Sequence, residues 1–226
     1  MAPRHGNHSQ DARIATLGDA YARAVLAGDE VAAEMTIREA IAVKLTTAQI
    51  DDEIIAPALW LVGELWARGE ITVADEHLAT EISVRVLALQ REAARLAVER
   101  RRRRVLLAAP AGERHVVALG MVANLVREAG YDALMLGADV PPRALGAAAR
   151  RHRPDVVVLS ATMPGGGDRV LIAVDDVLRD WPSARFVAGG QALTSRLRGQ
   201  PGIVVCDRVS EVVEAVDAAV KRAELN

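Results

Sequence analysis

Residues 155–160 read Asp-Val-Val-Val-Leu-Ser, a run that is apolar at every position between its two polar ends. A strand with apolar side chains on both sides is buried on both faces, which is typical of parallel sheets covered by helices. Further short apolar runs lie on either side of it in the chain, at residues 105–109, 133–137, 185–188 and 203–206. These runs predict five strands of one sheet.

Helical patterns separate the predicted strands. They cover residues 115–129, a helix entered at Pro141-Pro142, residues 169–179 and a closing amphipathic helix over residues 209–221. Strands that alternate with helices indicate an α/β fold with a doubly wound parallel sheet. We therefore expect residues 105–226 to form one α/β domain.

Residues 12–98 have helical periodicity throughout and predict an antiparallel four-helix bundle. The first helix ends at Gly28-Asp29, and the second covers residues 31–45. The third runs from Thr46 to about Ala67, and the fourth from Thr72 to about Arg95.

Two of these helix starts have a sequence signal. Thr46 with Gln49 resembles a capping box, and Thr72 with Asp75 is similar. Pro57 lies inside the third helix and is expected to kink or divide it, because proline has no backbone N–H to donate.

An arginine run, residues 100–104, lies between the two predicted domains. Residues 1–98 hold 15 acidic and 9 basic residues, a net charge of −6, whereas residues 99–226 hold 15 acidic and 19 basic residues, a net charge of +4. Five of those 19 are the run itself, so no distributed basic face for nucleic acid is expected. The run is interpreted as a solvated linker at residues 99–104, with a local contact to a phosphate or an acidic partner as the alternative.

Composition excludes several classes of protein. A single cysteine, Cys206, excludes a disulfide framework and a cysteine-rich metal site, and its apolar neighbours predict a buried thiol. No run of about 18 apolar residues exists, and residues 1–11 are polar. We expect a soluble cytoplasmic protein with no membrane association.

Polar side chains and glycines follow three of the predicted strands. Glu113 and His115 come after the first strand, Ser160 and Thr162 end the third, and Gly189-Gly190 ends the fourth. In such a sheet, ligands bind outside the carboxyl ends of the strands, so these residues are expected to meet at one edge. The absence of a Cβ at the glycine pair would let a ligand lie against the backbone. Taken singly, His115 is an ordinary polar residue at a helix start, and the glycines are a turn.

The spacing of these residues forms an array. It consists of Glu113-x-His115-x-x-Ala118, 41 residues, Ser160-x-Thr162, 26 residues, and Gly189-Gly190. The array resembles the cobalamin-binding signature D-x-H-x-x-G, S-x-L and G-G, which occurs in flavodoxin- or Rossmann-like domains. It departs from that pattern at Glu113 for Asp, Ala118 for Gly and Thr162 for Leu.

The resemblance implies roles for these residues. His115 would displace the cofactor's benzimidazole and ligate cobalt from below, with Glu113 as the acceptor that orients its ring. Val116 would contact the cofactor beside His115. The slot for the displaced nucleotide tail would be lined by Ser160, Thr162, Gly189 and Gly190.

A second motif lies in the predicted bundle. Trp66, nine residues and Glu76-His77 resemble the Trp-x9-Glu-His motif in the helical cap of light-sensing adenosylcobalamin proteins. The resemblance implies that these three residues contact the adenosyl group on the upper face of the corrin. The alternative interpretation is a core tryptophan and an acidic residue at a helix start. Trp60 is expected to pack in the bundle core.

Some light-sensing relatives have a histidine directly after the motif tryptophan that captures cobalt once adenosyl has gone. Ala67 stands at that position here, so His77, water or another group would fill the vacated site. About eleven residues precede the first predicted helix, too few for a winged-helix domain. We therefore expect no direct DNA binding, and an output through a homo-oligomer that responds to light or through an unknown protein partner.

The sequence thus predicts a cobalamin photoreceptor in which light breaks the cobalt–carbon bond of adenosylcobalamin and alters domain packing and oligomeric state. The resemblance extends to the photocobilins, which also hold a bilin, although no residue motif here demands biliverdin. No nucleophile–base pair supports independent catalysis, so a non-enzyme is expected. The main alternative is a corrinoid methyl carrier of a methyltransferase system, and the others are a mutase subunit and a domain without cofactor.

Overall fold

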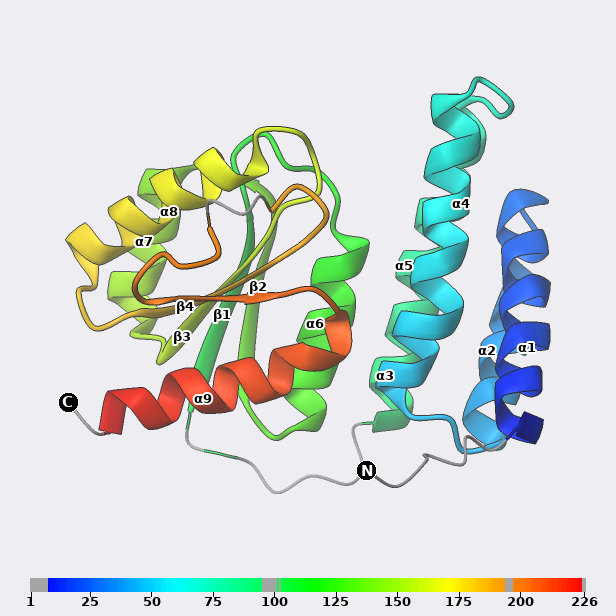
Figure 1. The fold of residues 1–226 in the computed structure, drawn as a ribbon, viewed down its shortest axis with the longest axis horizontal. Coiled ribbons are helices and arrows are strands. Elements are labelled where there is room, and N and C mark those ends of the chain that lie inside the picture. The colour runs from blue at the N-terminus through cyan, green and yellow to red at the C-terminus, as the bar shows by residue number, and fades with distance from the viewer. Residues whose placement is uncertain (1–7, 95–100, 102, 194–196, 225–226) are drawn as a thin grey trace. The chain divides into compact units, whose positions relative to one another are not determined.

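The N-terminal part of the chain is helical, as the sequence predicts (Figure 1). The computed structural model describes residues 8–94, 101, 103–193 and 197–224, and the chain divides into one unit of residues 1–92 and another of residues 93–226. The helices of the first unit are α1 (His8–Leu26), α2 (Glu30–Ala42), α3 (Thr47–Ile50), the π-helical segment η1 (Asp51–Ile55), α4 (Ala56–Ala67) and α5 (Val73–Ala94).

Both predicted helix starts in this unit are confirmed. The Thr46 hydroxyl accepts a hydrogen bond from the backbone N–H of Gln49, whose side chain accepts from the Thr46 backbone at 3.0 Å. Asp75 accepts from the Thr72 backbone at 2.8 Å, and Thr72 accepts in return at 3.3 Å. These bonds satisfy N–H groups that a helix start otherwise leaves without partners.

Pro57 does not divide the third predicted helix. Helix α3, segment η1 and helix α4 follow one another without a break, and the N–H of Ala56 bonds to the carbonyl of Asp51, five residues earlier. A proline lacks the N–H of a regular helix and its ring crowds the preceding turn. The helix accommodates the proline by widening the turn just before Pro57 into a π-helical turn.

The interior of the helical unit contains buried polar pairs. The Tyr21 hydroxyl donates to Ser83 at 2.9 Å, and the Gln90 amide donates to Asp51 at 3.1 Å. Burial raises the pKa of Tyr21 to about 12. These pairs link α1 to α5, and η1 to α5.

The expectation that Trp60 packs in the core is wrong. Its side chain is 54% exposed, whereas Ala58 and Val62 on the same helix are buried. Two residues along a helix correspond to a rotation of about 200°, so Trp60 lies opposite the buried stripe.

The second unit contains the predicted α/β fold. Five parallel strands in the order β2-β1-β3-β4-β5 form the sheet, with α7 and α8 on one face and α6 and α9 on the other (Figure 1). The strands are β1 (Arg104–Pro110), β2 (Asp132–Val140), β3 (Val156–Ser160), β4 (Arg185–Gly189) and β5 (Ile203–Cys206). The helices are α6 (Val117–Glu128), α7 (Pro142–His152), α8 (Gly166–Asp180), the 3-10 turn η2 (Val209–Glu211) and α9 (Val212–Glu224).

Strand β3 is buried at all five positions, as its apolar run predicts. It lies between β1 and β4, and its side chains pack with those of α7 and α8 in one core cluster. None of the helices in the described ranges combines the length and apolar character needed to cross a membrane.

Several predicted boundaries shift. Strand β2 continues past Gly137 to Val140, because the pairing with β1 resumes after register irregularities at Ala108. Helix α6 begins two residues after the predicted start at His115, and α8 begins at Gly166 rather than Arg169.

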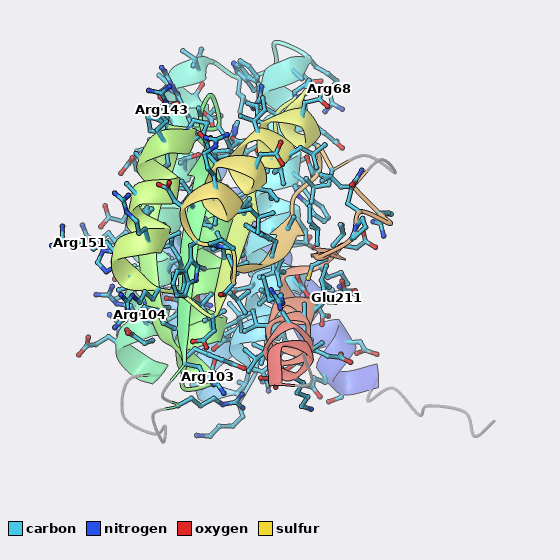
Figure 2. All side chains as sticks on the ribbon, turned by 90° about the vertical axis from the view of Figure 1, so that its left-hand side faces the viewer. Arg68, Arg103, Arg104, Arg143, Arg151 and Glu211 are labelled. Carbon is cyan, nitrogen blue, oxygen red and sulfur yellow. The ribbon has the colours of Figure 1, made fainter. Side chains whose placement is uncertain are left out.

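The described arginines of the run are partly exposed, at 46% for Arg101, 40% for Arg103 and 41% for Arg104, but they also form ion pairs. Arg101 pairs with Asp217 at 2.5 Å, and Arg103 pairs with Asp155 at 2.9 Å. Arg104 begins β1 and pairs with Asp132; Figure 2 shows Arg103 and Arg104 at the same end of the sheet unit. The charges are compensated by aspartates far away in sequence. Residues 99, 100 and 102 lie outside the described residues.

Cys206 is buried at the end of β5, as predicted. Burial, together with the nearby carboxylates of Glu211 and Asp207, raises the pKa of its thiol to about 11. A thiol in this state is not a nucleophile near neutral pH.

Close packing of α7 on α8 gives a test of the fold. A Cβ at Gly146 would lie 2.8 Å from the backbone oxygen of Asp176. Gly146→Ala should therefore lower the free energy of unfolding by about 1–3 kcal/mol in urea denaturation. Gly63→Ala on α4 is the control: nothing lies within 4 Å of its Cβ position, so it should be neutral or stabilise by about 0.5–1 kcal/mol. Equal effects of the two variants would contradict the packing argument.

Candidate functional site

The loops that follow β1 and β3 lie side by side at the carboxyl edge of the sheet, next to the end of β4 (Figure 1). Ser160 stands opposite Gly189 in the register of β3 with β4, and the N–H of Ala161 donates to the Gly189 carbonyl at 3.0 Å. The Thr162 backbone donates to the Glu113 side chain at 2.6 Å. The prediction that the three sets of residues meet at one edge is therefore confirmed.

Glu113 is the centre of this edge. Its side chain is fully buried, and each carboxylate oxygen accepts two hydrogen bonds. One oxygen accepts the His115 backbone N–H at 2.9 Å and bonds the ring Nδ1 at 2.6 Å. The other accepts the N–H groups of Thr162 and Met163, at 2.6 and 2.9 Å.

Two opposing effects act on the Glu113 carboxyl group. Burial on its own would raise the pKa, but the hydrogen bonds from His115, Met163 and Thr162 outweigh it and lower the pKa to about 2. Glu113 is therefore an ionised carboxylate near neutral pH. An ionised carboxylate can only accept hydrogen bonds, so this contact favours the His115 tautomer with its proton on Nδ1, in which Nε2 carries the lone pair.

His115 lies in the loop just before α6, with Val116 as the residue that caps the helix. Its side chain is 51% exposed, in contrast to the buried carboxylate that holds it. The exposed, oriented imidazole can donate Nε2 to a metal, and such an orienting carboxylate is the usual support of a histidine ligand. Val116 is half-buried beside it.

The residues after β3 differ from each other in burial. Ser160 is buried, and Thr162 is half-buried. The hydroxyl oxygen of Thr162 is buried without a hydrogen-bond partner among the described protein atoms. A buried hydroxyl normally has a partner, so this one is suited to a ligand atom at the same edge.

The glycine pair needs a correction. A Cβ at Gly190 would lie 2.2 Å from the backbone oxygen of Ala161, and the backbone there has a φ of +121°. The space that was expected to admit a ligand is thus filled by Ala161 of the same chain. At Gly189, a Cβ would make only an ordinary contact, at 3.6 Å from the Cys206 carbonyl.

Two residues at this edge were not predicted. Asp139, after the sequence-predicted end of β2, accepts the Gly112 N–H at 2.7 Å and donates its own N–H to the Glu113 carbonyl at 2.8 Å. Arg169, in the first turn of α8, donates to the Met163 carbonyl at 3.2 Å and the Pro164 carbonyl at 3.0 Å. The sequence would indicate Asp139 only if strand β2 were predicted to reach its observed end at Val140. No motif in the sequence indicates Arg169.

The bundle motif belongs to the other unit. Trp66 lies near the end of α4 and is 50% exposed, while Glu76 and His77 lie in the first turns of α5. The turn between these helices joins them at one end of the unit (Figure 1). The His77 ring Nδ1 lies 2.5 Å from a Glu76 oxygen, and the other Glu76 oxygen accepts from Thr80 at 3.0 Å. Glu76 therefore holds His77 as Glu113 holds His115.

These features fit a corrinoid. A corrin supplies four nitrogen ligands to its cobalt, so the protein needs to add one axial donor rather than a ligand cluster. His115 is such a donor, and the Thr162 hydroxyl is free to bond a polar group of a ligand. No group of three or more His, Cys, Asp or Glu side chains that could hold a metal ion occurs in the part of the chain that the structure describes.

The fold and this edge define a cobalamin-binding class of protein. Residues 103–217 match the B12 binding domain family, and residues 17–90 match a second family with the same description. The chain belongs to the B12-binding domain family. The resemblance to cobalamin-binding proteins that the sequence predicted is therefore confirmed.

Two curated relatives are transcriptional repressors of Myxococcus xanthus. The HTH-type transcriptional repressor CarH is 36% identical over 199 residues, which are 84% of this chain and 65% of the relative. The HTH-type transcriptional repressor CarA is 32% identical over 128 residues, 57% of this chain and 44% of the relative. The chain spans less than two thirds of the length of either. Both relatives support the resemblance to the light-sensor family.

A solved structure resembles the whole fold. The monomethylamine corrinoid protein of Methanosarcina barkeri superposes with a TM-score of 0.68 at 17% identity, over 92% of this chain and 98% of that one. This likeness confirms the predicted order of a helical region and an α/β domain.

Glu113→Asp tests the hydrogen bonds at the centre of the site. Aspartate, the residue of the related signature, is one methylene shorter. In the loop geometry of this chain we therefore expect it to lose either the bonds to His115 or those to the amides of Thr162 and Met163. The free energy of unfolding should fall by about 1–3 kcal/mol, because partly buried N–H groups lose their acceptor. Urea denaturation measures this, with Glu128→Asp at the exposed end of α6 as the control. A Glu113→Asp variant as stable as the control would contradict the assignment.

Proposed function

We propose that this protein is a light-sensing regulator that binds adenosylcobalamin with the cofactor's benzimidazole displaced and His115 as the lower cobalt ligand. The observation that carries the proposal is the exposed His115 ring, whose Nδ1 is held by a buried carboxylate and whose Nε2 is available. The family match and the two repressor relatives support it. The proposal is for a sensor and not an enzyme, located in the cytoplasm.

The tail of the cofactor would lie at the same edge. Ser160 and Thr162, with Val116 beside the ligand, would contact it, and the buried Thr162 hydroxyl would gain a partner. Gly189 would line the slot through its backbone, whereas Gly190 packs against Ala161. Biliverdin is not part of the proposal.

Trp66, Glu76 and His77 of the bundle would contact the adenosyl group, which is the upper axial ligand of the cobalt. Trp66 offers a half-exposed aromatic face, and the Glu76–His77 pair offers an oriented polar edge, which together suit an adenine ring and its ribose. When bound, adenosylcobalamin supplies a cobalt–carbon bond that visible light breaks. A ligand shifts the equilibrium between two conformations only if it contacts them differently. Contacts of these three residues with adenosyl would therefore make the conformation of the bundle depend on whether adenosyl is present.

The output would be a change of oligomeric state or an altered contact with an unknown protein partner. The second candidate function is a corrinoid methyl carrier, which the fold likeness to the monomethylamine corrinoid protein favours. That likeness concerns the fold alone. The Trp66…Glu76-His77 spacing favours the sensor.

Light-dependent assembly tests the proposed function. The purified chain is mixed with adenosylcobalamin in darkness, and absorbance and size-exclusion profiles are recorded before and after green light. We expect a bound spectrum unlike that of the free cofactor and an elution volume that changes with light. His115→Ala should retain less cofactor and return its spectrum toward the free form.

A light-independent elution volume, together with methylation of a reduced bound corrinoid by a methyl donor, would establish the methyl carrier instead. An unchanged spectrum in His115→Ala would exclude His115 as the ligand.

Trp66→Ala tests whether Trp66 recognises the adenosyl group of the cofactor. The variant should still bind cobalamin but lose its preference for adenosylcobalamin over methylcobalamin and hydroxocobalamin, as measured by spectroscopic titration. Trp60→Ala is a matched control, because Trp60 lies on the same helix and is similarly exposed, at 54% against 50%. If the two variants have the same selectivity, Trp66 has no special part in recognition.

A further inference from the structure

Arg169 bridges the two loops that form the candidate site. Its guanidinium donates to the carbonyls of Met163 and Pro164, at 3.2 and 3.0 Å, in the loop after β3. Its side chain also lies against Gly112, in the loop after β1: a Cβ at Gly112 would be 3.5 Å from Arg169 Cδ and 3.9 Å from Cζ. The guanidinium is thus fixed next to the loop segments that contain Glu113 and Thr162.

Arg169 has no counter-charge among the residues that the structure describes. Within the described residues, Arg169 makes no ion pair, and its bonds go to two neutral carbonyls. Its Nε is buried and has no hydrogen-bond partner there. Arg103, Arg104 and Arg179 in the same unit each pair with an aspartate. A half-buried guanidinium without a counter-charge favours an anionic ligand.

A cobalamin contains one anionic group in its side chains, the phosphodiester of the nucleotide tail; the remaining corrin substituents are neutral amides. Planar guanidinium groups bind phosphate oxygens more specifically than ammonium groups do. We propose that Arg169 pairs with this phosphodiester and selects corrinoids that have a complete nucleotide tail. The inference rests on the proposed binding of cobalamin at this edge.

A purely structural role for Arg169 makes a different prediction. If its two carbonyl bonds only brace the loop after β3, removal of the guanidinium will weaken cobinamide binding as well, because that loop holds Glu113 and thereby the His115 ring. If Arg169 pairs with the phosphodiester, the loss will be confined to corrinoids that have one. Cobinamide, which lacks the nucleotide and its phosphodiester, separates the two roles.

The experiment measures dissociation constants of the full chain for hydroxocobalamin and for diaquacobinamide by spectroscopic titration. Arg169→Gln should weaken hydroxocobalamin binding by about tenfold, the value of one charge-assisted hydrogen bond, and leave cobinamide binding unchanged. Arg169→Lys should recover part of the loss, because it keeps the charge. Arg143→Gln is the matched control, since Arg143 is an exposed arginine at the start of α7, labelled in Figure 2.

The outcomes are distinguishable. A loss of cobinamide binding in Arg169→Gln, or no loss for hydroxocobalamin, would overturn the pairing with the phosphodiester while leaving the proposed function intact. Failure of the unaltered chain to bind either corrinoid would overturn the proposed function itself. Circular dichroism checks the fold of each variant. If Arg169→Gln does not fold, the dissociation constant of Arg169→Lys for cobinamide decides the question, because pairing with the phosphodiester leaves it at the value of the unaltered chain and a structural role raises it.

Discussion

The candidate site depends on the hydrogen bonds that the buried carboxylate of Glu113 accepts from two loops. A buried charge is costly unless hydrogen bonds compensate it, and here three backbone N–H groups and one imidazole do so. Because these donors come from the loops after β1 and β3, the same bonds that stabilise the charge also hold the loops together. They fix the His115 ring as well, so the loop structure and the orientation of the proposed ligand cannot be varied independently.

Much of the fold could be predicted from local patterns. The five apolar runs and the Thr46–Gln49 capping box act through neighbouring residues, and each has its predicted place. Apart from the helix face on which Trp60 lies, the features that local patterns miss are interactions between residues far apart in sequence. The arginines of the predicted linker pair with Asp155 and Asp217, and strand β2 is prolonged by renewed pairing with β1. Neither the ion pairs nor the renewed strand pairing produces a periodic pattern in the sequence.

The same distinction applies to the site. Residues at the carboxyl ends of adjacent parallel strands must meet, so the proximity of Glu113, His115 and Thr162 follows from the topology once the strands are assigned. The contacts of Arg169 could not be predicted, because they depend on how the first turn of α8 lies on a neighbouring loop. The roles proposed for Trp66, Glu76 and His77 rest on the spacing of the motif and on the exposure of the Trp66 and His77 side chains.

The contact between Gly190 and Ala161 affects how the signature is used to recognise distant proteins. A side chain at position 190 would collide with the backbone of the neighbouring loop, whatever the domain binds. A descendant that had lost its cofactor would therefore remain under selection to retain this glycine. Among diverged sequences, the glycine pair marks a shared architecture, and the histidine and its supporting acid are the better markers of an active cofactor site.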